Sequence, residues 1–365
     1  MGRARRGGRG PGGRALNAAP GAFAEDGYHA DPDDATLTGP GALAAPGPPG
    51  GPGGTGGPAG PGVLGTLTLA RSAVDRAAER RTDTAWLDAA WAEPGTRVLV
   101  IDDGQALTRF TAGGAELVFI PPPQAPPGVR FLLGVDAAGV VYFGVLGPLP
   151  DLDPDSAAGA RPASLRQAGQ LLGDRDAGLM THAVALANWH AISTHCSRCG
   201  TVTEPANAGH ARRCPADGSE HFPRLDPAVI MLVTDPADRC LLARNSRWPQ
   251  RRVSILAGFV EPGESAEQAV AREVLEETGV SIGEVRYLGS QPWPMPHSLM
   301  LGFRALAAGG QQIQVDADEI AEASWFSREE LRASVASGDL LLPPPVSIAH
   351  RIIESWYGEE LPGAW

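Results

Sequence analysis

Residues 258–280 read GFVEPGESAEQAVAREVLEETGV, and the rest of the chain is organised around this stretch. Its first part is rich in turn residues, and Ser265 is a favourable residue for capping the start of a helix. Gly279 is a typical residue for ending one. The stretch therefore predicts a turn followed by a helix that runs to about Thr278.

Three carboxylates share one face of this predicted helix, at spacings i, i+3 and i+4: Glu273, Glu276 and Glu277. Three apolar side chains are expected to pack on a sheet from the other side: Ala271, Val274 and Leu275. Like charges this close repel one another, and a hard divalent cation such as Mg²⁺ converts the repulsion into binding because it prefers oxygen ligands. The alternative is an ordinary acidic amphipathic helix.

The stretch resembles the Nudix box, G-x5-E-x7-R-E-U-x-E-E-x-G-U with U aliphatic, at every fixed position. Glu264 and Arg272 occupy the remaining charged positions, and Val274 and Val280 fill the aliphatic ones. Agreement at nine specified positions with one spacing argues against the plain amphipathic helix. The resemblance implies a metal-dependent hydrolase, in which Arg272 is expected to orient Glu264 through a bidentate pair.

Length and composition limit the other readings. The chain has 365 residues, enough for two or three domains, and a net charge of −12, which argues against broad electrostatic binding of nucleic acid. No apolar run reaches the roughly 18 residues expected of a membrane span. Four cysteines cannot define a disulfide scaffold at this length, and a CxxC pair indicates a metal in a reducing compartment.

Residues 1–65 are predicted to be a disordered tail. From residue 46 to residue 62, 15 of 17 residues are Gly or Pro, and such a segment cannot bury enough apolar area to offset its chain entropy. Arginines among the first fourteen residues leave a nucleic-acid or targeting arm as an alternative, although a passive tail is favoured.

Residues 66–190 are predicted to form an α/β domain. Asp83 can cap a helix at 84–92, and further helices are predicted at 164–172 and 178–194. Short strands are predicted at 97–101, 116–120, 130–135 and 140–145. Leu186, Trp189 and His190 form an apolar-aromatic stripe that is more typical of a core than of a cofactor site.

Residues 191–226 are predicted to form a zinc ribbon. Cys196 and Cys199 form a CxxC knuckle followed by glycine, and Cys214 lies at a ribbon-like distance. A four-cysteine ribbon would place its last cysteine where this chain has Asp217, and zinc accepts a carboxylate oxygen. The alternative fourth ligands are His221 and His210, and the alternative to zinc is a set of buried thiols. The fourth cysteine, Cys240, is expected to be a core thiol.

Residues 227–358 are predicted to form an α/β/α sandwich. Strands are predicted at 228–234, 240–244, 284–290, 299–306 and 321–326, and helices at 328–337 and 346–356. Residues 253–256 lead into the box. The fold class is thus a Nudix α/β/α sandwich preceded by a zinc ribbon and an N-terminal α/β domain.

The segment after the box reads SQPWPMPHS at residues 290–298, a loop expected to be stiffened by three prolines. At this distance from a Nudix box, SQPWPxPxS resembles the signature of the NADH pyrophosphatase subfamily, which usually has Phe where Met295 stands. The exit of the ribbon, HFPR at 221–224, and the stretch LLPPP at 341–345 also resemble this subfamily. The resemblance covers about residues 66–358.

The resemblance implies several groups of site residues. Divalent metal would be held by the Ala257 carbonyl together with glutamates: Glu273, Glu276, Glu277 and Glu319. Phe222 and Phe259 would sandwich a base. The dinucleotide would be lined by Ala349 and by the stretch after the box: Gln291, Pro292, Trp293, Pro294, Met295, Pro296, His297 and Ser298. The chain departs from some members at His182, where they have a substrate-contacting Arg, and at Gly209, where they have a Glu ligand to the substrate.

The predicted function is hydrolysis of the diphosphate of NADH or NAD⁺ to nicotinamide mononucleotide and AMP, with Mg²⁺ or Mn²⁺ at the glutamates and Zn²⁺ in the ribbon. Glu276 or Glu277 is expected to take the proton from water. Removal of NAD caps from RNA 5′ ends and a broader ADP-ribose hydrolase are the enzymatic alternatives, and a nucleotide-sensing or RNA-binding module is the non-enzymatic one. The resemblance further implies a cytoplasmic homodimer that does not bind a membrane.

Overall fold

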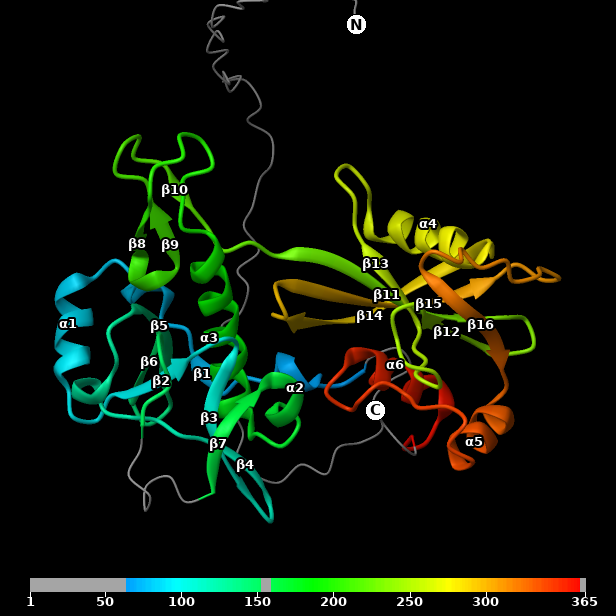
Figure 1. Ribbon diagram of the computed structural model, residues 1–365, viewed down its shortest axis with the longest axis horizontal. Coiled ribbons are helices and arrows are strands. Elements are labelled where there is room, and N and C mark those ends of the chain that lie inside the picture. Colours follow the sequence, from blue (N-terminus) through cyan, green and yellow to red (C-terminus); the bar gives the residue numbers. More distant parts are fainter. Residues whose placement is uncertain (1–63, 152–158, 362–365) are drawn as a thin grey trace, which may run out of the picture. The chain divides into compact units, whose positions relative to one another are not determined.

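The computed structural model describes residues 64–151 and 159–361 (Figure 1). The predicted tail at 1–65 lies outside the described residues except for its last two positions. None of the helices within the described ranges combines the length and the apolar character that a membrane span requires.

Within the described residues, the first domain contains a four-stranded sheet in the order β1-β5-β6-β2 and a three-stranded sheet in the order β4-β3-β7. The strands are β1 (Val74–Asp75), β2 (Arg97–Ile101), β3 (Gln105–Thr111), β4 (Gly114–Leu117), β5 (Val129–Asp136), β6 (Val141–Leu146) and β7 (Ala160–Ser164). The helices are α1 (Thr84–Ala92), α2 (Leu165–Ala168) and α3 (Asp174–Ile192), with 3₁₀ turns η1 (Thr68–Ala70), η2 (Ala78–Arg80) and η3 (Pro122–Gln124).

The sequence located most of these elements, and α1 is confirmed together with its cap, because the Asp83 carboxylate accepts a hydrogen bond from the Trp86 N–H at 3.0 Å. The helix predicted over 164–172 is wrong in length: α2 is a single turn. Strand β3 was not predicted, since its fully buried residues are Ala106 and Thr108, which give a weak apolar alternation. The aromatic stripe of α3 is confirmed as core, with Trp189 and His190 both buried.

The ribbon is a small antiparallel sheet in the order β10-β9-β8. Its elements are β8 (Glu204–Ala206), η4 (Asn207–Gly209), β9 (Ala211–Arg213) and β10 (Glu220–His221). A buried arginine joins it to α3: Arg212 donates to the side chain and the carbonyl of Thr203 and to His190 Nδ1. This contact fixes the ribbon on the end of α3.

The last domain is built on a mixed sheet in the order β14-β15-β11-β12-β16, with β13 paired to β11. Its strands are β11 (Asp226–Thr234), β12 (Cys240–Asn245), β13 (Leu256–Phe259), β14 (Ile282–Trp293), β15 (Ser298–Ala307) and β16 (Ile320–Phe326). Its helices are α4 (Ala266–Thr278), α5 (Arg328–Ala336) and α6 (Ile348–Tyr357).

Side-chain alternation along β11 explains the layers, because successive residues of a strand point to opposite faces of the sheet. Val229 and Met231 lie in one core cluster with residues of α4, whereas Ile230 and Leu232 lie in another with residues of α6. Helices α4 and α6 therefore cover opposite faces of the sheet, which confirms the predicted α/β/α sandwich (Figure 1). Cys240 is confirmed as a core thiol, and burial raises its pKa to about 12.

The structure adds one strand to this domain and corrects one prediction. Strand β13, at Leu256–Phe259, was not predicted; the residues that lead into it make only isolated bridges to Ala243 and Leu341. The stretch 290–298 is also less of a loop than expected, since β14 continues to Trp293 and β15 begins at Ser298. Pro292 fits within β14 because this is the edge strand of the sheet, where a missing N–H costs little.

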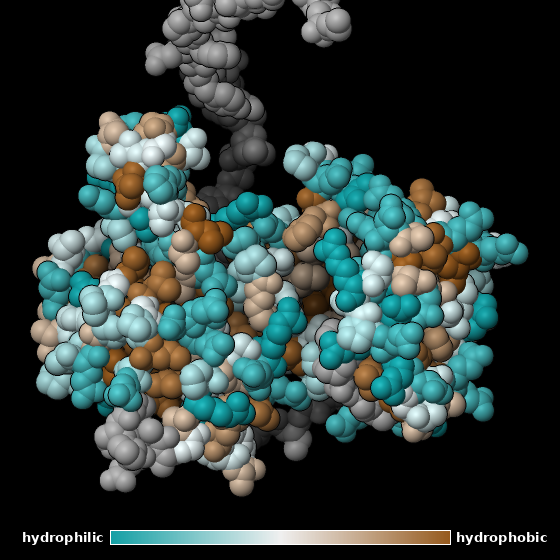
Figure 2. Space-filling model, viewed as in Figure 1, coloured by the Kyte–Doolittle hydropathy of each residue, from teal (hydrophilic) through white to brown (hydrophobic). Residues whose placement is uncertain are grey.

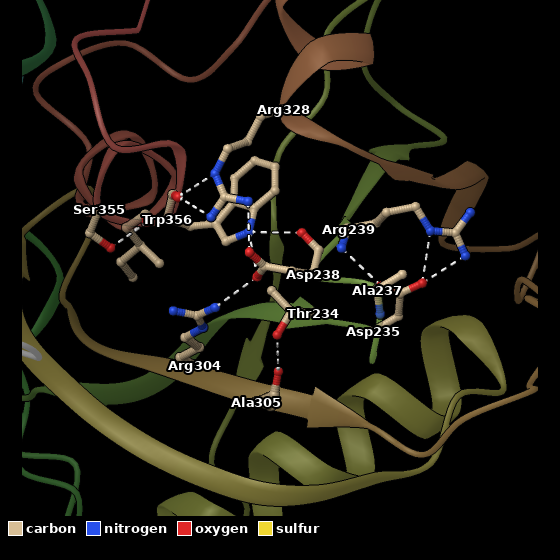
Figure 3. A network of polar contacts seen from close by, with 11 residues as sticks. Thr234, Asp235, Ala237, Asp238, Arg239, Arg304, Ala305, Arg328, Ser355 and Trp356 are labelled. Carbon is tan, nitrogen blue, oxygen red and sulfur yellow. Dashed lines mark hydrogen bonds and ion pairs between the residues drawn. The ribbon is translucent and has the colours of Figure 1, made fainter.

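A polar network ties the β11–β12 turn to the helices on the α6 side (Figure 3). Asp238 has a φ of 59°, and its carboxylate accepts hydrogen bonds from Arg328, Arg304 and the Trp356 indole. Arg328 also donates twice to the Trp356 carbonyl, at 2.7 and 3.0 Å. The network joins β15, α5 and α6 and leaves the opposite, α4 side of the sheet free for the acidic groups.

Candidate active site and metal centres

The sequence of α4 defines both of its ends. Ser265 and Gln268 form a capping box, in which the Ser265 hydroxyl accepts from the Gln268 N–H and the Gln268 side chain accepts from the Ser265 N–H. Gly279 ends the helix with a φ of 68°, a left-handed conformation that favours glycine. The predicted helix is thus confirmed at both boundaries, and Figure 2 shows a mainly hydrophilic surface over it.

The predicted orientation of α4 is wrong. Ala271 and Leu275 are exposed, whereas Glu273 and Glu277 are buried together with Val270 and Val274. Glu276 lies beside the buried pair, with 58% of its side chain exposed. The helix therefore directs two of its carboxylates toward the sheet, where their charges are poorly solvated.

Arg272 organises the acidic groups through its planar guanidinium. It forms a bidentate pair with Glu264, with N–O distances of 2.8 and 2.9 Å, as the sequence predicted. It also donates to Glu273 and Glu276 at 2.9 Å each, and to the Phe259 carbonyl at 2.9 Å. Hydrogen bonds from Arg272 and from the Glu261 N–H lower the pKa of Glu264 to about 2. The Arg272 guanidinium thus fixes the carboxylate of the turn and two carboxylates of α4 relative to one another.

Gly258 lies directly against Glu273. A Cβ atom at position 258 would lie 1.9 Å from the carboxyl carbon of Glu273, which is far inside van der Waals contact. Glycine is therefore required for space, and it lets strand β13 approach α4 closely enough to confine the Glu273 carboxylate.

Glu277 is the most perturbed of the carboxylates. Its side chain is buried, and its Oε2 has no hydrogen-bond partner among the described residues. Burial, followed by repulsion from Glu273, Glu319 and Glu276, raises its pKa to about 8. Burial also raises the pKa of Glu273. A buried, unpartnered carboxylate with three others nearby is relieved of its desolvation and repulsion by a proton or by a bound cation, and oxygen ligands of this kind suit a hard divalent cation.

The two other predicted metal-site positions lie on different elements. Ala257 is on β13, where it pairs with Ile230 and is exposed. Glu319 is exposed immediately before β16, and its charge acts on both Glu273 and Glu277. The structure therefore brings Glu319 into the electrostatic neighbourhood of α4 from about forty residues away in sequence.

The hairpin that joins β14 to β15 holds the predicted dinucleotide-lining residues. Gln291 is fully buried; its side chain donates to the Val346 carbonyl at 3.1 Å and accepts from the Leu69 N–H at 3.4 Å. The Gln291 amide is thus used within the fold. Ala349 is also buried, at the start of α6. The turn of the hairpin itself, residues 294–297, contains a cis Met295–Pro296 bond.

The same hairpin contacts the first domain. Asn188 of α3 donates to the Pro294 carbonyl at 2.8 Å, and Trp293 and Met295 pack against the first domain's main core. The Arg166 guanidinium lies 4.8 Å from the centre of the Trp293 ring. Sequence analysis did not single out Arg166 or Asn188, because nothing in their local sequence shows that α2 and α3 meet this hairpin.

At the base of the hairpin, His297 pairs with the start of β11. Its Nδ1 lies 3.3 Å from the Asp226 carboxylate, which also accepts a hydrogen bond from Arg224. Because a carboxylate only accepts, His297 Nδ1 is the donor in this contact. This pair anchors the turn on the strand that follows the ribbon.

The two predicted base-stacking rings are both available to solvent. Phe222 is 64% exposed at the ribbon exit, and Phe259 is 59% exposed at the end of β13. Among the described residues, no ring contact joins them. The predicted sandwich of a base between these two rings stays a prediction.

The ribbon brings together four candidate ligands from two turns: Cys196, Cys199, Cys214 and Asp217. Their ligand atoms all lie within 4.8 Å of one another. The distance is 3.5 Å from Cys199 Sγ to Cys214 Sγ and 3.6 Å from Cys196 Sγ to Asp217 Oδ2. Ligands about 2.3 Å from a tetrahedral zinc are separated by roughly 3.7 Å, so the cluster fits that ion.

The two turns of the ribbon repeat one geometry. In the first, Cys196 N–H donates to Thr201 and Gly200 N–H donates to Cys196; in the second, Cys214 and Gly218 make the equivalent bonds. Gly200 and Gly218 have the same φ of 74°. Asp217 therefore stands where Cys199 stands in the first turn, and the sequence signal for this role is the match of CPADG to CSRCG.

The competing histidines lie outside the cluster. His210 Nε2 bonds to the Leu132 carbonyl at 2.8 Å, and His221 Nε2 lies 3.2 Å from the Ser219 hydroxyl. The geometry thus favours Asp217 as the fourth ligand. Burial opposes ionisation of Cys196, but hydrogen bonds from Ser219 and from nearby backbone N–H groups outweigh it and lower its pKa to about 6.

The two positions at which the chain departs from the subfamily pattern lie next to each other. The His182 ring is 5.2 Å from the His210 ring and is buried. A Cβ atom on Gly209 would lie 2.3 Å from the Phe131 Cβ, so no side chain fits there. A glutamate ligand at position 209 is therefore incompatible with this packing.

Comparisons with known proteins agree with this architecture. Residues 224–342 match the family model for the NUDIX domain, residues 193–222 match the NADH pyrophosphatase zinc ribbon domain, and residues 95–189 match the NADH pyrophosphatase-like rudimentary NUDIX domain. A solved NUDIX hydrolase from Nitrosomonas europaea aligns with a TM-score of 0.37 and 20% identity over 47% of this chain and 96% of that one.

Two curated relatives are similar over most of the chain. NAD-capped RNA hydrolase NudC of Mycobacterium bovis is 45% identical over 301 residues, covering 79% of this chain and 94% of the relative. Human NAD-capped RNA hydrolase NUDT12 is 32% identical over 337 residues, covering 79% of this chain and 72% of the relative.

Proposed function

This chain belongs to the Nudix hydrolase family, in the group that carries an NADH pyrophosphatase zinc ribbon, and we propose that it hydrolyses the diphosphate of NADH and NAD⁺ to nicotinamide mononucleotide and AMP. The observation that carries the proposal is the acidic centre of α4, where one arginine fixes three carboxylates beside a buried, unpartnered Glu277.

Glu273 and Glu277 are proposed to hold Mg²⁺ or Mn²⁺, together with Glu319 and the Ala257 carbonyl. Such a cation neutralises the charge of a diphosphate and makes water a better nucleophile. The burial of Glu277 and the pKa of about 8 that results supply the fit, since this carboxylate is costly to ionise in the absence of a cation. Gly258 supports the arrangement because it leaves the space that Glu273 fills.

Glu276 is proposed to accept the proton of the attacking water. It is the exposed member of the set, and Arg272 holds one of its oxygens at 2.9 Å while the other remains available. Arg272 is proposed to be a positioning residue, because its guanidinium donates to the carboxylates of Glu264, Glu273 and Glu276 and to the Phe259 carbonyl. Glu264 in turn holds Arg272 in the plane that these contacts require.

The β14–β15 hairpin is proposed to bind the dinucleotide. Gln291 supports the hairpin from inside the fold, and Trp293 is held between the first domain's core and Arg166. Phe259 is proposed to stack on a base, a contact worth about 1–3 kcal/mol. Because Phe222 and Phe259 are both exposed, we propose that they close on the base when the substrate binds, either within one chain or across a homodimer, and a measurement of mass in solution tests the dimer.

The ribbon is proposed to bind one structural Zn²⁺ through Cys196, Cys199, Cys214 and Asp217. Structural zinc binding contributes directly to folding free energy, so the ion would hold the two turns together. The ribbon's thiols are all free, which agrees with the proposed cytoplasmic location.

A second candidate substrate is NAD-capped RNA, and the similarity to NudC and NUDT12, both named NAD-capped RNA hydrolases, favours it. The bond broken is the same diphosphate, so the two functions share one catalytic centre. A broader ADP-ribose hydrolase uses the same chemistry without recognition of the second base.

The decisive experiment measures kcat/KM for NADH, NAD⁺, ADP-ribose and NAD-capped RNA side by side, with Mg²⁺ and with Mn²⁺. We expect NADH, NAD⁺ and capped RNA to be cleaved at least about tenfold more efficiently than ADP-ribose, because only they offer a second base to stack. Equal values for all four would refute recognition of the dinucleotide, and no cleavage of any would refute the proposed function.

A further inference from the structure

A pocket of about 380 Å³ lies where the first domain meets the ribbon. It is bounded on one side by β5, by α1 and by the segment before α1, and on the other side by β8 and η4. None of its lining residues belongs to α4 or to the β14–β15 hairpin, so the catalytic arrangement above does not account for it.

The polar side chains that line this pocket are all hydrogen-bond donors: Arg81, Thr82, Thr84, Arg130 and Asn207. No Asp or Glu is among the lining residues, all of which the structure describes. Arg130 is partly engaged, since it lies 3.7 Å from Asp88 and stacks over Trp91 at 4.5 Å. The remaining donors face a volume large enough for a small ligand.

Arg81 is the residue that most needs a partner. Its Nε is buried and makes no hydrogen bond with any described residue. A buried guanidinium nitrogen without an acceptor loses hydration without compensation. The nearby charged side chains do not offset this cost, because the repulsion between Arg76 and Arg81 is stronger than the attraction between Glu79 and Arg81.

The positive potential extends behind the pocket. Burial, followed by repulsion from Arg76 and other cationic groups, holds the pKa of His182 well below its usual range. Burial, and then repulsion from Arg81 and Arg76, lowers the pKa of His210 to about 4 despite its hydrogen bond to Leu132. Both imidazoles therefore stay neutral, and no described carboxylate lines the pocket to balance Arg81.

We propose that this pocket binds an oxyanion of the phosphate class, either free phosphate or the phosphate of a mononucleotide, with Arg81 as the principal ligand. The Thr82 and Thr84 hydroxyls and the Asn207 amide complete the donor set. Since these groups come from both the first domain and the ribbon turn, a bound anion bridges the two. The site is distinct from the diphosphate site on α4. A bound anion would stabilise the contact between the ribbon and the first domain.

The test uses the full chain without added divalent cation and measures binding of inorganic phosphate and of AMP by calorimetry, with thermal unfolding in parallel at matched ionic strength. We expect phosphate or AMP to raise the unfolding midpoint by about 2 °C or more. Arg81→Gln should weaken this binding at least tenfold. Arg80→Gln is the matched control, because Arg80 is the neighbouring cation and does not line the pocket; its binding should match that of the unmodified chain.

A second variant keeps the test decisive if Arg81→Gln fails to fold. Asn207 has a φ of 49°, which Asp also tolerates, so Asn207→Asp adds a negative charge at the pocket with little change of shape. It should also weaken binding at least tenfold. Phosphate binding that depends on Arg81 supports a free oxyanion, and AMP binding that alone depends on it supports a nucleotide phosphate. If neither ligand's affinity changes in either variant, the pocket is not an anion site.

Discussion

Replacing Glu277 by Gln should make the protein more stable and the enzyme much slower. Glu277 is buried among carboxylates, and its pKa is raised to about 8 from an ordinary value of 4.5. Below about pH 4.5 the folded and unfolded chains both carry the proton, so this group costs no stability there. As the pH rises toward 8 only the folded chain keeps the proton, and stability falls.

The size of the effect follows from this difference. Between pH 4.5 and pH 7 the penalty grows by about 1.36 kcal/mol per pH unit, which gives about 3 kcal/mol at pH 7 in the absence of divalent cation. Gln has a similar shape and never ionises, so the variant avoids the penalty. Loss of a metal-binding carboxylate should at the same time reduce kcat by roughly 10²-fold or more.

The assay is urea unfolding of both proteins at pH 5 and pH 7.5, with and without Mg²⁺, alongside kcat for NADH. The variant's advantage should be larger at pH 7.5 than at pH 5 and should shrink with Mg²⁺, which favours the ionised wild-type carboxylate. Glu276→Gln is the matched control, because that side chain is exposed and should show little change in stability. A Glu277→Gln protein that is less stable than wild type at pH 7.5 without metal would refute the reasoning.

Three further predictions follow from other contacts. Gly258→Ala should lower kcat at least about tenfold, because the new methyl must displace the Glu273 carboxylate that lies 1.9 Å from its position; unchanged kinetics would show that Glu273 is free to move. Cys196→Ser should reduce both zinc content and thermal stability, and Asp217→Ala should do so to a smaller extent; elemental analysis showing no zinc in folded, active wild-type protein would contradict this. Phe259→Ala should reduce kcat/KM for NADH by about 10–100-fold, with a much smaller loss on a diphosphate that lacks the second base; equal losses would indicate that Phe259 supports the fold.

The sequence predicted what depends on local spacing. The capping box at Ser265, the left-handed Gly279 and the pairing of Arg272 with Glu264 all lie within one short stretch, so their geometry follows from residue offsets. The same holds for the ribbon, where two similar turns each carry a glycine after the second ligand. In both cases the backbone conformation requires particular residue types, so the sequence pattern predicts the local structure.

Features that depend on contacts between distant parts of the chain could not be predicted from the sequence. Apolar content predicted that Leu275 faces the sheet, but the helix instead buries Glu273 and Glu277 and leaves Leu275 exposed. A local rule of this kind is expected to fail where a helix carries functional groups. Gln291 was predicted to line the dinucleotide site, and its local sequence did not show that its side chain also contacts Val346 and Leu69, partners 55 and 222 residues away. Arg166 was not considered, because its contact with Trp293 joins two segments that are far apart in the sequence.

Asp217, the carboxylate in the second turn of the ribbon, affects which oxidised forms the ribbon's thiols can reach. Three thiols close at most one disulfide within the cluster, and the Sγ atoms of Cys199 and Cys214 lie 3.5 Å apart. Such a bond leaves Cys196 as an unpaired thiol, which can proceed along the path from sulfenic acid to irreversible forms. A four-cysteine ribbon can store its oxidised state as two reducible bonds. If oxidants displaced the proposed zinc, the ribbon would therefore be open to damage that reduction alone does not repair.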